Sequence, residues 1–329
     1  MPIPTLLLNI LFLILGFVFL IKGADVFVDG ASTIAKIFKV PALIIGLTIV
    51  ALGTSLPELA VSVVASINNS TDLSVGNVVG SNIFNILMVL GTTSVLIPIA
   101  IQKEVLRFEL PFVLFVSIFL LILGFVGNNE VNWLFGIIFL LLLVIYIFVL
   151  IKRTINENKE KVEEIQEEKK ISPIKAIIFL ILGAALIIFG GECVNTTSVV
   201  IAEFFGMDEQ LIALTIVAIG TSLPELITSL VAAKKGENDI ALGNVIGSNT
   251  LNILFILGLS SLITPLPITP NMSFDLIFMV FVTIELIIMA IITFKNKGLN
   301  KTCGIILIST YVLYMAYIIC RNYNILPGF

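Results

Sequence analysis

The chain contains no histidine and only three cysteines, Cys193, Cys303 and Cys320, which stand too far apart for a metal-binding spacing. These absences remove the usual zinc ligands and the commonest general base of enzyme catalysis. No nucleophile stands in a recognisable relation to a base along the sequence, so we expect neither an enzyme nor a prosthetic group. Each cysteine is interpreted as a small buried hydrophobe.

Charge is also scarce. Only 12% of the 329 residues are charged, whereas soluble proteins carry about 25%. Hydrophobic residues make up 58% of the chain, and the mean hydropathy is +1.16. This composition predicts an all-α integral membrane protein whose main partner is the lipid bilayer. We expect no nucleic acid partner, because no basic patch with interleaved aromatics is present, and we infer no obligatory protein partner.

Apolar segments long enough to cross a bilayer as helices recur along the whole chain. Ten are expected, near residues 5–22, 40–66, 75–101, 109–127, 133–151, 174–190, 210–232, 240–264, 274–294 and 303–320. A Lys- and Glu-rich stretch divides them into two groups of five, so we expect a first repeat over residues 1–151, a linker over 152–172 and a second repeat over 173–329. The linker is interpreted as a solvated helix, with a regulatory ion site as the other reading.

Lysine and arginine predict the orientation in the membrane. With the ten spans drawn alternately up and down, 17 of the 18 basic residues fall on one side and only Arg321 on the other. By the positive-inside rule, both termini then lie outside the cell membrane and the linker lies in the cytoplasm.

The two halves repeat each other at a constant offset of 167 residues. Leu47–Leu59 and Leu214–Leu226 agree at 12 of 13 positions, and Gly76–Gly91 and Gly243–Gly258 agree at 11 of 16. Because each half has an odd number of spans, the second half must enter the membrane from the opposite side, which predicts inverted repeats. Inverted repeats with broken helices are typical of secondary transporters that work by alternating access.

Each half places one glutamate, Glu58 or Glu225, in an apolar span within the sequence G-T-S-L-P-E. A charge inside the bilayer costs at least ~2.5 kcal/mol, so an intramembrane glutamate indicates a functional site. The alternative is a protonated carboxyl that only braces the bundle. Pro57 and Pro224 lack a backbone N–H, so the carbonyls of Gly53 and Gly220 lose their helical partners.

Further oxygen donors share helix faces in the same regions, at spacings of four residues. They are Thr54 with Glu58, Ser81 with Asn85, Thr221 with Glu225, and Ser248 with Asn252. An oxygen-only ligand set suits hard cations, above all Ca²⁺, and suits Mg²⁺ and soft metals less well. Two ionised glutamates carry a charge that one Ca²⁺ or two monovalent cations would neutralise. An empty charged site is costly to move through a dry intermediate, which favours coupled exchange.

The paired G-T-S-L-P-E and G-N-x-x-G-S-N motifs resemble the two alpha-repeats of the sodium/calcium exchanger family, in its prokaryotic form, within the cation/calcium antiporter superfamily. The resemblance implies a ten-span antiporter that moves Ca²⁺ out of the cytoplasm against entering Na⁺. It also implies that Glu58 and Glu225 are central metal ligands. The other implied ligands are Thr54, Ser55, Thr221, Ser222, Ser81, Asn85, Ser248, Asn252 and the carbonyls of Ala51 and Ala218.

Asn252 departs from some relatives, including potassium-dependent ones, which carry an Asp at this position. The chain then has only two central carboxylates, which weakens the case for potassium dependence and leaves the sodium stoichiometry open. The nearest alternative function is a proton/calcium antiporter, although such relatives usually carry a G-N-x-x-E motif. A cation channel and an intramembrane hydrolase are further alternatives.

Four of the remaining acidic residues also receive an interpretation. Glu285, in the ninth span, is interpreted as a carboxyl hydrogen-bonded within the bundle or as a peripheral proton or ion relay. Asp25, Asp29 and Glu192 lie near span ends and are interpreted as solvated interface residues or as guides for incoming cations.

Overall fold

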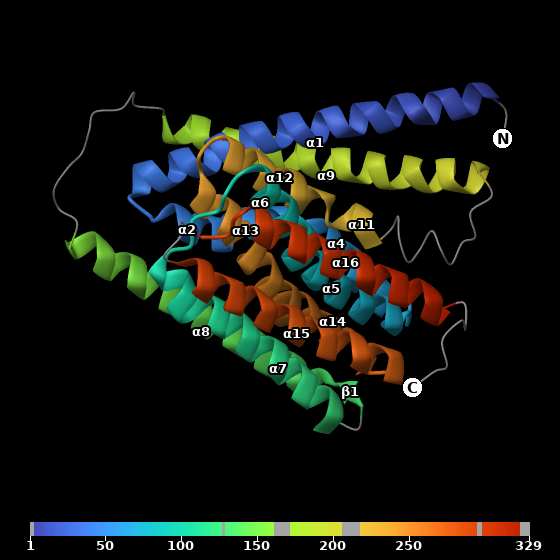
Figure 1. The fold of residues 1–329 in the computed structure, drawn as a ribbon. Coiled ribbons are helices and arrows are strands. Elements are labelled where there is room, and N and C mark those ends of the chain that lie inside the picture. Colours follow the sequence, from blue (N-terminus) through green and yellow to red (C-terminus); the bar gives the residue numbers. More distant parts are fainter. Residues whose placement is uncertain (1–2, 127–128, 161–171, 206–217, 295–297, 323–329) are drawn as a thin grey trace.

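The computed structural model describes residues 3–126, 129–160, 172–205, 218–294 and 298–322. Nearly all of them are helical (Figure 1). The first half contains α1 (Ile3–Phe38), α2 (Ala42–Ile45), the π-helical η1 (Gly46–Val50), α3 (Ala51–Thr54), α4 (Leu56–Ile67), α5 (Thr71–Phe84), η2 (Asn85–Leu90), α6 (Gly91–Leu96), η3 (Val105–Glu109), α7 (Leu110–Val126), β1 (Glu130–Val131) and α8 (Trp133–Glu160). The second half contains α9 (Pro173–Phe204), α11 (Ala218–Thr221), α12 (Leu223–Lys234), α13 (Asn238–Leu251), η5 (Asn252–Leu257), α14 (Gly258–Ile263), β2 (Leu266–Pro267), α15 (Pro270–Thr293) and α16 (Lys301–Asn322).

The described residues contain eight helical stretches that are long and apolar enough to cross a membrane. The pair Ala42–Thr54 and Leu56–Ile67 is also long and apolar enough when taken together, and it is bent by 50° at its break, so the described residues hold up to nine candidate spans. These findings confirm a helical, multi-pass membrane protein. The span expected at 210–232 lies partly outside the described residues, which resume at Ala218, so the number ten stays a prediction.

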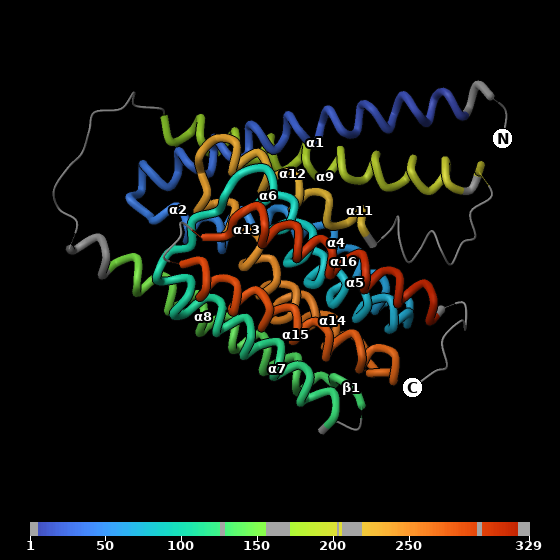
Figure 2. The backbone as a smooth tube through the Cα atoms, viewed as in Figure 1, coloured from blue at the N-terminus to red at the C-terminus, as the bar shows by residue number. Residues whose placement is uncertain are grey.

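The two longest helices, α1 and α9, pack side by side and run in opposite directions (Figures 1 and 2). Both continue well past the spans expected at residues 5–22 and 174–190, to Phe38 and Phe204. The packing is close enough to require glycine, because a Cβ added at Gly183 would lie 2.6 Å from the backbone nitrogen of Phe27. Buried side chains between α1, α9, α12 and α13 form a hydrophobic cluster that is separate from the main core.

Both G-T-S-L-P-E segments break their helices at the serine. Ser55 has φ −85° and ψ 8°, and Ser222 has φ −95° and ψ 6°. A helix restarts directly after each serine with proline at an early position, where its missing N–H is tolerated. The next helix of each half, α5 or α13, runs through the bundle and passes into a π-helical segment at Asn85 or Asn252. Such π-helical segments are frequent at functional sites.

A small amount of β-structure departs from the all-α prediction. Strands β1 and β2 pair antiparallel, with Val131 opposite Leu266, and an isolated bridge joins Ile99 to Leu299. Ile99 and Leu266 occupy equivalent positions in the two halves. The segments that leave the helices are extended there, and their backbone groups satisfy one another by pairing.

Candidate cation-binding site

The two glutamates that the sequence marks lie at the starts of the restarted helices. Glu58 is in the first turn of α4, Glu225 is in the first turn of α12, and both are 0% exposed. The helix dipole favours a negative charge at this end of a helix. The breaks at Ser55 and Ser222 therefore place two carboxyl groups inside the bundle, each in the first turn of a helix.

Each carboxylate is held by a serine from the other half of the chain. Ser55 Oγ donates to Glu225 Oε1 at 3.0 Å, and Ser222 Oγ donates to Glu58 Oε1 at 3.1 Å. Ser222 also lies 3.0 Å from Ser81 Oγ, and Ser248 Oγ lies 3.5 Å from Glu225 Oε1. The structure thus brings both glutamates and four of the expected serine ligands together in one buried network.

Four oxygens of this region are buried and have no hydrogen-bond partner within the part of the chain that the structure describes. They are Glu58 Oε2, Glu225 Oε2, Asn85 Oδ1 and Asn252 Oδ1. They form two matched pairs, one oxygen of each pair from each half. An unpaired buried polar atom costs about 1–3 kcal/mol, so its retention indicates a role. Two carboxylate and two amide oxygens are the ligand types that Na⁺ and Ca²⁺ prefer.

The amide nitrogens of these two asparagines are already engaged. Asn85 Nδ2 donates to Asn249 Oδ1 at 3.1 Å, and Asn252 Nδ2 donates to Asn82 Oδ1 at 3.0 Å. Each bond crosses between the halves and fixes which atom of the amide remains available. The available atom is the oxygen, as cation binding requires.

The two expected threonine ligands and the Ala51 carbonyl already have hydrogen-bond partners within the protein. Thr54 Oγ1 lies 3.0 Å from Asn244 Oδ1, and Thr221 Oγ1 lies 3.4 Å from Asn77 Oδ1. The Ala51 carbonyl accepts from Ser55 N at 3.0 Å and from Thr54 Oγ1 at 3.3 Å, so it is not a freed carbonyl.

The hydrogen bonding near Ala218, the second expected carbonyl ligand, differs from that at Ala51. Ser222 N donates to Ile219 O at 3.1 Å, one residue beyond Ala218. The backbone at the second break is therefore hydrogen-bonded differently from the backbone at the first.

Four asparagines that the sequence reasoning did not single out support the site. Asn77 Nδ2 and Asn244 Nδ2 donate to the carbonyls of Glu58 and Glu225 at 3.2 and 3.3 Å. Asn82 and Asn249 each donate to the other's backbone carbonyl at 3.2 Å. All four belong to the repeated G-N-x-x-G-S-N motif. The repetition was the signal for them, but nothing in the sequence separated the structural amides from the ligand amides.

Other polar features lie apart from this network. Thr310 Oγ1 donates to Glu285 Oε1 at 3.2 Å, which ties that carboxylate to α16.

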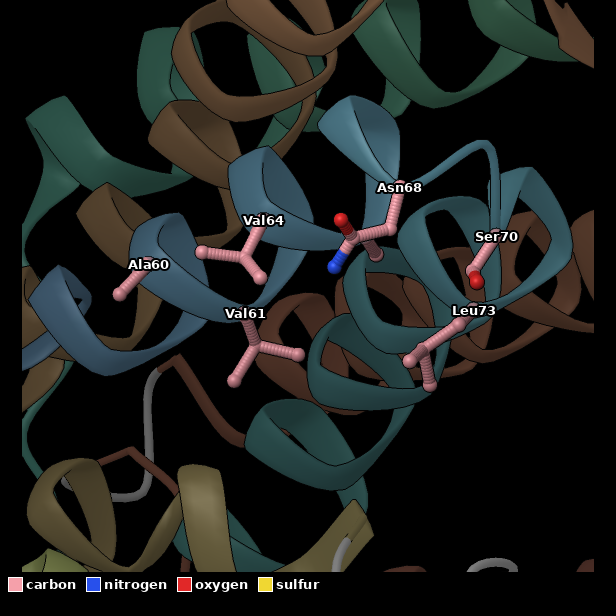
Figure 3. A pocket seen from close by; sticks show the side chains of 7 residues that line it. Ala60, Val61, Val64, Asn68, Ser70 and Leu73 are labelled. Carbon is pink, nitrogen blue, oxygen red and sulfur yellow. The ribbon is translucent and has the colours of Figure 1, made fainter.

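A hollow of about 360 Å³ between α4 and α5 is lined mainly by apolar side chains such as Val61, Val64 and Leu73, with none of the expected ligands (Figure 3). Across the described ranges, no three His, Cys, Asp or Glu side chains cluster as for a metal ion. The site therefore combines two acids with neutral oxygens.

This fold and this buried network define a membrane-embedded cation antiporter and not an enzyme. The chain belongs to the sodium/calcium exchanger protein family, whose family model matches residues 8–152 and 175–320. The resemblance of the motifs is thereby confirmed.

Relatives match over nearly their whole length. The chain is 35% identical to sodium/calcium exchanger MaX1 of Methanosarcina acetivorans, with 86% of this chain and 91% of that protein covered. It is 38% identical to the putative antiporter CaxA of Alkalimonas amylolytica, with 86% and 90% covered. A solved structure of the sodium-calcium exchanger NCX_Mj superposes with a TM-score of 0.82 at 31% identity and covers 95% of this chain and 99% of its own.

Proposed function

We propose that the protein exchanges Na⁺ for Ca²⁺ across the cell membrane by alternating access. The observation that carries the proposal is a set of four buried oxygens without a partner among the described residues, from Glu58, Glu225, Asn85 and Asn252. The hydroxyls of Thr54, Thr221, Ser55, Ser222, Ser81 and Ser248 complete the set of side-chain ligands. Ca²⁺ takes about six to eight oxygens in a flexible arrangement, which a set of this kind can supply.

Charge balance explains why movement is coupled to cargo. Two ionised glutamates in a fully buried site repel each other and lack solvent, so the empty site resists occlusion. One Ca²⁺ or two Na⁺ neutralise this charge and permit the occluded state. Coupled exchange follows, because the protein does not readily change between its outward-facing and inward-facing states unless an ion is bound.

We further propose ten spans in two inverted repeats, over residues 1–151 and 173–329, joined by the linker 152–172. A matched set of contacts near the span ends of each half supports this arrangement. In each set, which we call a clamp, a tyrosine and an arginine contact one acidic side chain. Tyr146 Oη donates to Glu109 Oε2 at 2.7 Å in the first half. In the second half, Tyr314 Oη donates to Asp275 Oδ1 at 3.2 Å.

An arginine completes each clamp. Arg153 lies 3.6 Å from Glu109, and Arg321 lies 3.1 Å from Asp275. Each tyrosine also stacks on a phenylalanine, with ring centroids 4.5 Å apart for Phe112 and Tyr146 and 4.4 Å apart for Phe278 and Tyr314. The pairing with Asp275 accounts for Arg321 as the one basic residue on its side of the membrane.

The proposed orientation has both termini outside and the linker in the cytoplasm. Single cysteines at Ser172 and Asn129, in a chain without its three native cysteines, test it in intact cells. An impermeant thiol reagent should label the cysteine at Asn129 and spare the one at Ser172. The reverse labelling would invert the topology.

Calcium flux in proteoliposomes tests the function. An imposed Na⁺ gradient at clamped pH should drive Ca²⁺ accumulation, whereas a proton gradient without Na⁺ should not. The opposite result would favour proton/calcium exchange, which also suits two buried carboxylates. Large unitary currents in a planar bilayer would instead indicate a channel.

A further inference from the structure

The two halves differ in what lies beside the central site. A cavity of about 200 Å³ lies between α4, α9 and the break that separates α11 from α12. Its lining includes both prolines of the repeated motif and Thr221, so it reaches the central network. Two polar residues of α9, Glu192 and Asn195, line the same cavity.

Both residues carry side-chain oxygens, in a lining that is otherwise mainly apolar. They lie three positions apart on α9 and therefore share a face. Glu192 is exposed, and Thr196 Oγ1 donates to its Oε1 at 3.1 Å. Asn195 Oδ1 is buried and accepts no hydrogen bond from the described portions of the chain. The cavity is thus bordered by a carboxylate at an exposed position and by an amide oxygen that is buried against Gly220 and has no partner among the described residues.

The equivalent positions of the first half, 167 residues earlier, are filled differently. Val28 stands where Asn195 would be and is fully buried. A Cβ added at Gly53 would lie 2.7 Å from the Phe27 ring, whereas at the equivalent Gly220 it would meet the Asn195 amide. On this side, apolar packing therefore takes the place of the Asn195 side chain.

The first-half counterpart of Glu192, Asp25, is already paired with a cation. Lys235 Nζ lies 2.8 Å from Asp25 Oδ1 and 2.7 Å from Asp29 Oδ1. Burial lowers the pKa of Lys235, but hydrogen bonds to these aspartates and their charges outweigh it and raise the pKa overall. The lysine stays charged, and this side offers no free carboxylate at the position of Glu192.

We propose that Glu192 and Asn195 form an entry site for Na⁺ and Ca²⁺ on one face of the protein only, from which the cation passes to Thr221 and the central glutamates. The inference rests on the proposed exchange function. A cleft lined by negative charge raises the local concentration of cations. At ~30 Å³ per water, the cavity holds a cation that still carries several of its waters.

Sided transport kinetics test the entry site. Initial Ca²⁺ transport is measured against Ca²⁺ concentration at each face, in vesicles of defined orientation. Glu192→Gln and Asn195→Leu should each raise KM roughly three- to tenfold at the cavity face. Vmax, and KM at the opposite face, should stay unchanged. Choline chloride at high concentration should shrink the effect of Glu192→Gln, because salt screens an exposed charge.

Two further variants separate the entry site from general effects. Glu192→Asp keeps the charge and should retain most of the wild-type KM. Glu130→Gln removes a carboxylate from β1, on the same face in the proposed topology but outside the cavity lining, and should leave KM unchanged. An unchanged KM in Glu192→Gln, an equal rise at both faces, or the same rise in Glu130→Gln would overturn the entry site.

The same measurements keep this inference distinct from the exchange function. If the wild type exchanges Na⁺ for Ca²⁺ and Glu192→Gln behaves like it, only the entry site fails. If the wild type transports another pair of cations, the sided comparison is made with that pair and only the Na⁺/Ca²⁺ assignment fails. A chain that moves no cation at all would overturn both.

Discussion

Ser55 in the first half donates a hydrogen bond to Oε1 of Glu225 in the second half, at 3.0 Å. The reciprocal bond runs from Ser222 to Glu58 at 3.1 Å. Each repeat therefore orients the other's carboxylate. In both pairs the second oxygen of the carboxylate has no hydrogen-bond partner among the residues that the structure describes.

Replacing either serine should weaken ion binding to a similar degree. A hydrogen bond to a charged group contributes about 1.5–3 kcal/mol, so Ser55→Ala and Ser222→Ala should each raise KM for Ca²⁺ roughly 10- to 150-fold. Flux assays across a Ca²⁺ series check this. Ser117→Ala is the matched control, because Ser117 is buried but bonds only within α7, to the Val113 carbonyl. A normal KM in both site variants would show that the serines do not position the carboxylates.

Exchange should not require potassium. Asn252 is neutral, and its unpaired oxygen is an amide oxygen, so the centre contains two carboxylates and cannot balance an additional co-transported cation as a three-acid site would. Na⁺-driven Ca²⁺ uptake should therefore proceed at the same rate with K⁺ or choline as the companion ion. Uptake that stops without K⁺ would contradict this reading of Asn252.

The clamp between α15 and α16 should contribute to stability. Arg321 makes two hydrogen bonds to Asp275, at 3.2 and 3.1 Å, and Tyr314 donates a third at 3.2 Å. Removing one partner of such a pair costs about 1–3 kcal/mol, so Arg321→Gln should lower the melting temperature in detergent. The double variant with Asp275→Asn should lose less than the sum of the single losses. Additive losses would mean that the two side chains are not coupled.

The sequence predicted the helical membrane fold, the two breaks and the central glutamates because these features follow from composition and from a repeat. Charge in an apolar span and proline beside it are visible without a structure. The role of Asn82 and Asn249 could not be predicted from the sequence. An amide that pairs with a backbone carbonyl lies in the same local sequence as one proposed to bind an ion. The hydrogen bonds of the Ala51 carbonyl were not visible in the sequence either, and its role as a ligand stays a prediction. The helix breaks at Ser55, after the Ala51 carbonyl has been satisfied, and not at the residue that faces the missing N–H of Pro57.

The asymmetry between the halves was equally beyond the sequence. Asp25 and Glu192 align in the repeat, yet one is bound by Lys235 and the other lines a cavity. Lys235 is 210 residues from Asp25 in the chain, so only the packing of α1 against α12 brings them together.

Na⁺-driven Ca²⁺ uptake by proteoliposomes that contain Glu58→Gln or Glu225→Gln tests the central claim most directly. Glutamine keeps the size of glutamate but replaces one acceptor oxygen with an NH2 donor and removes the charge that balances the ion. Glu104→Gln, an exposed glutamate between α6 and η3, is the control. We expect near-complete loss of uptake in each site variant, at unchanged melting temperature, and normal uptake in the control. Sodium-driven uptake retained by either site variant would contradict a shared cation site built on these two carboxylates.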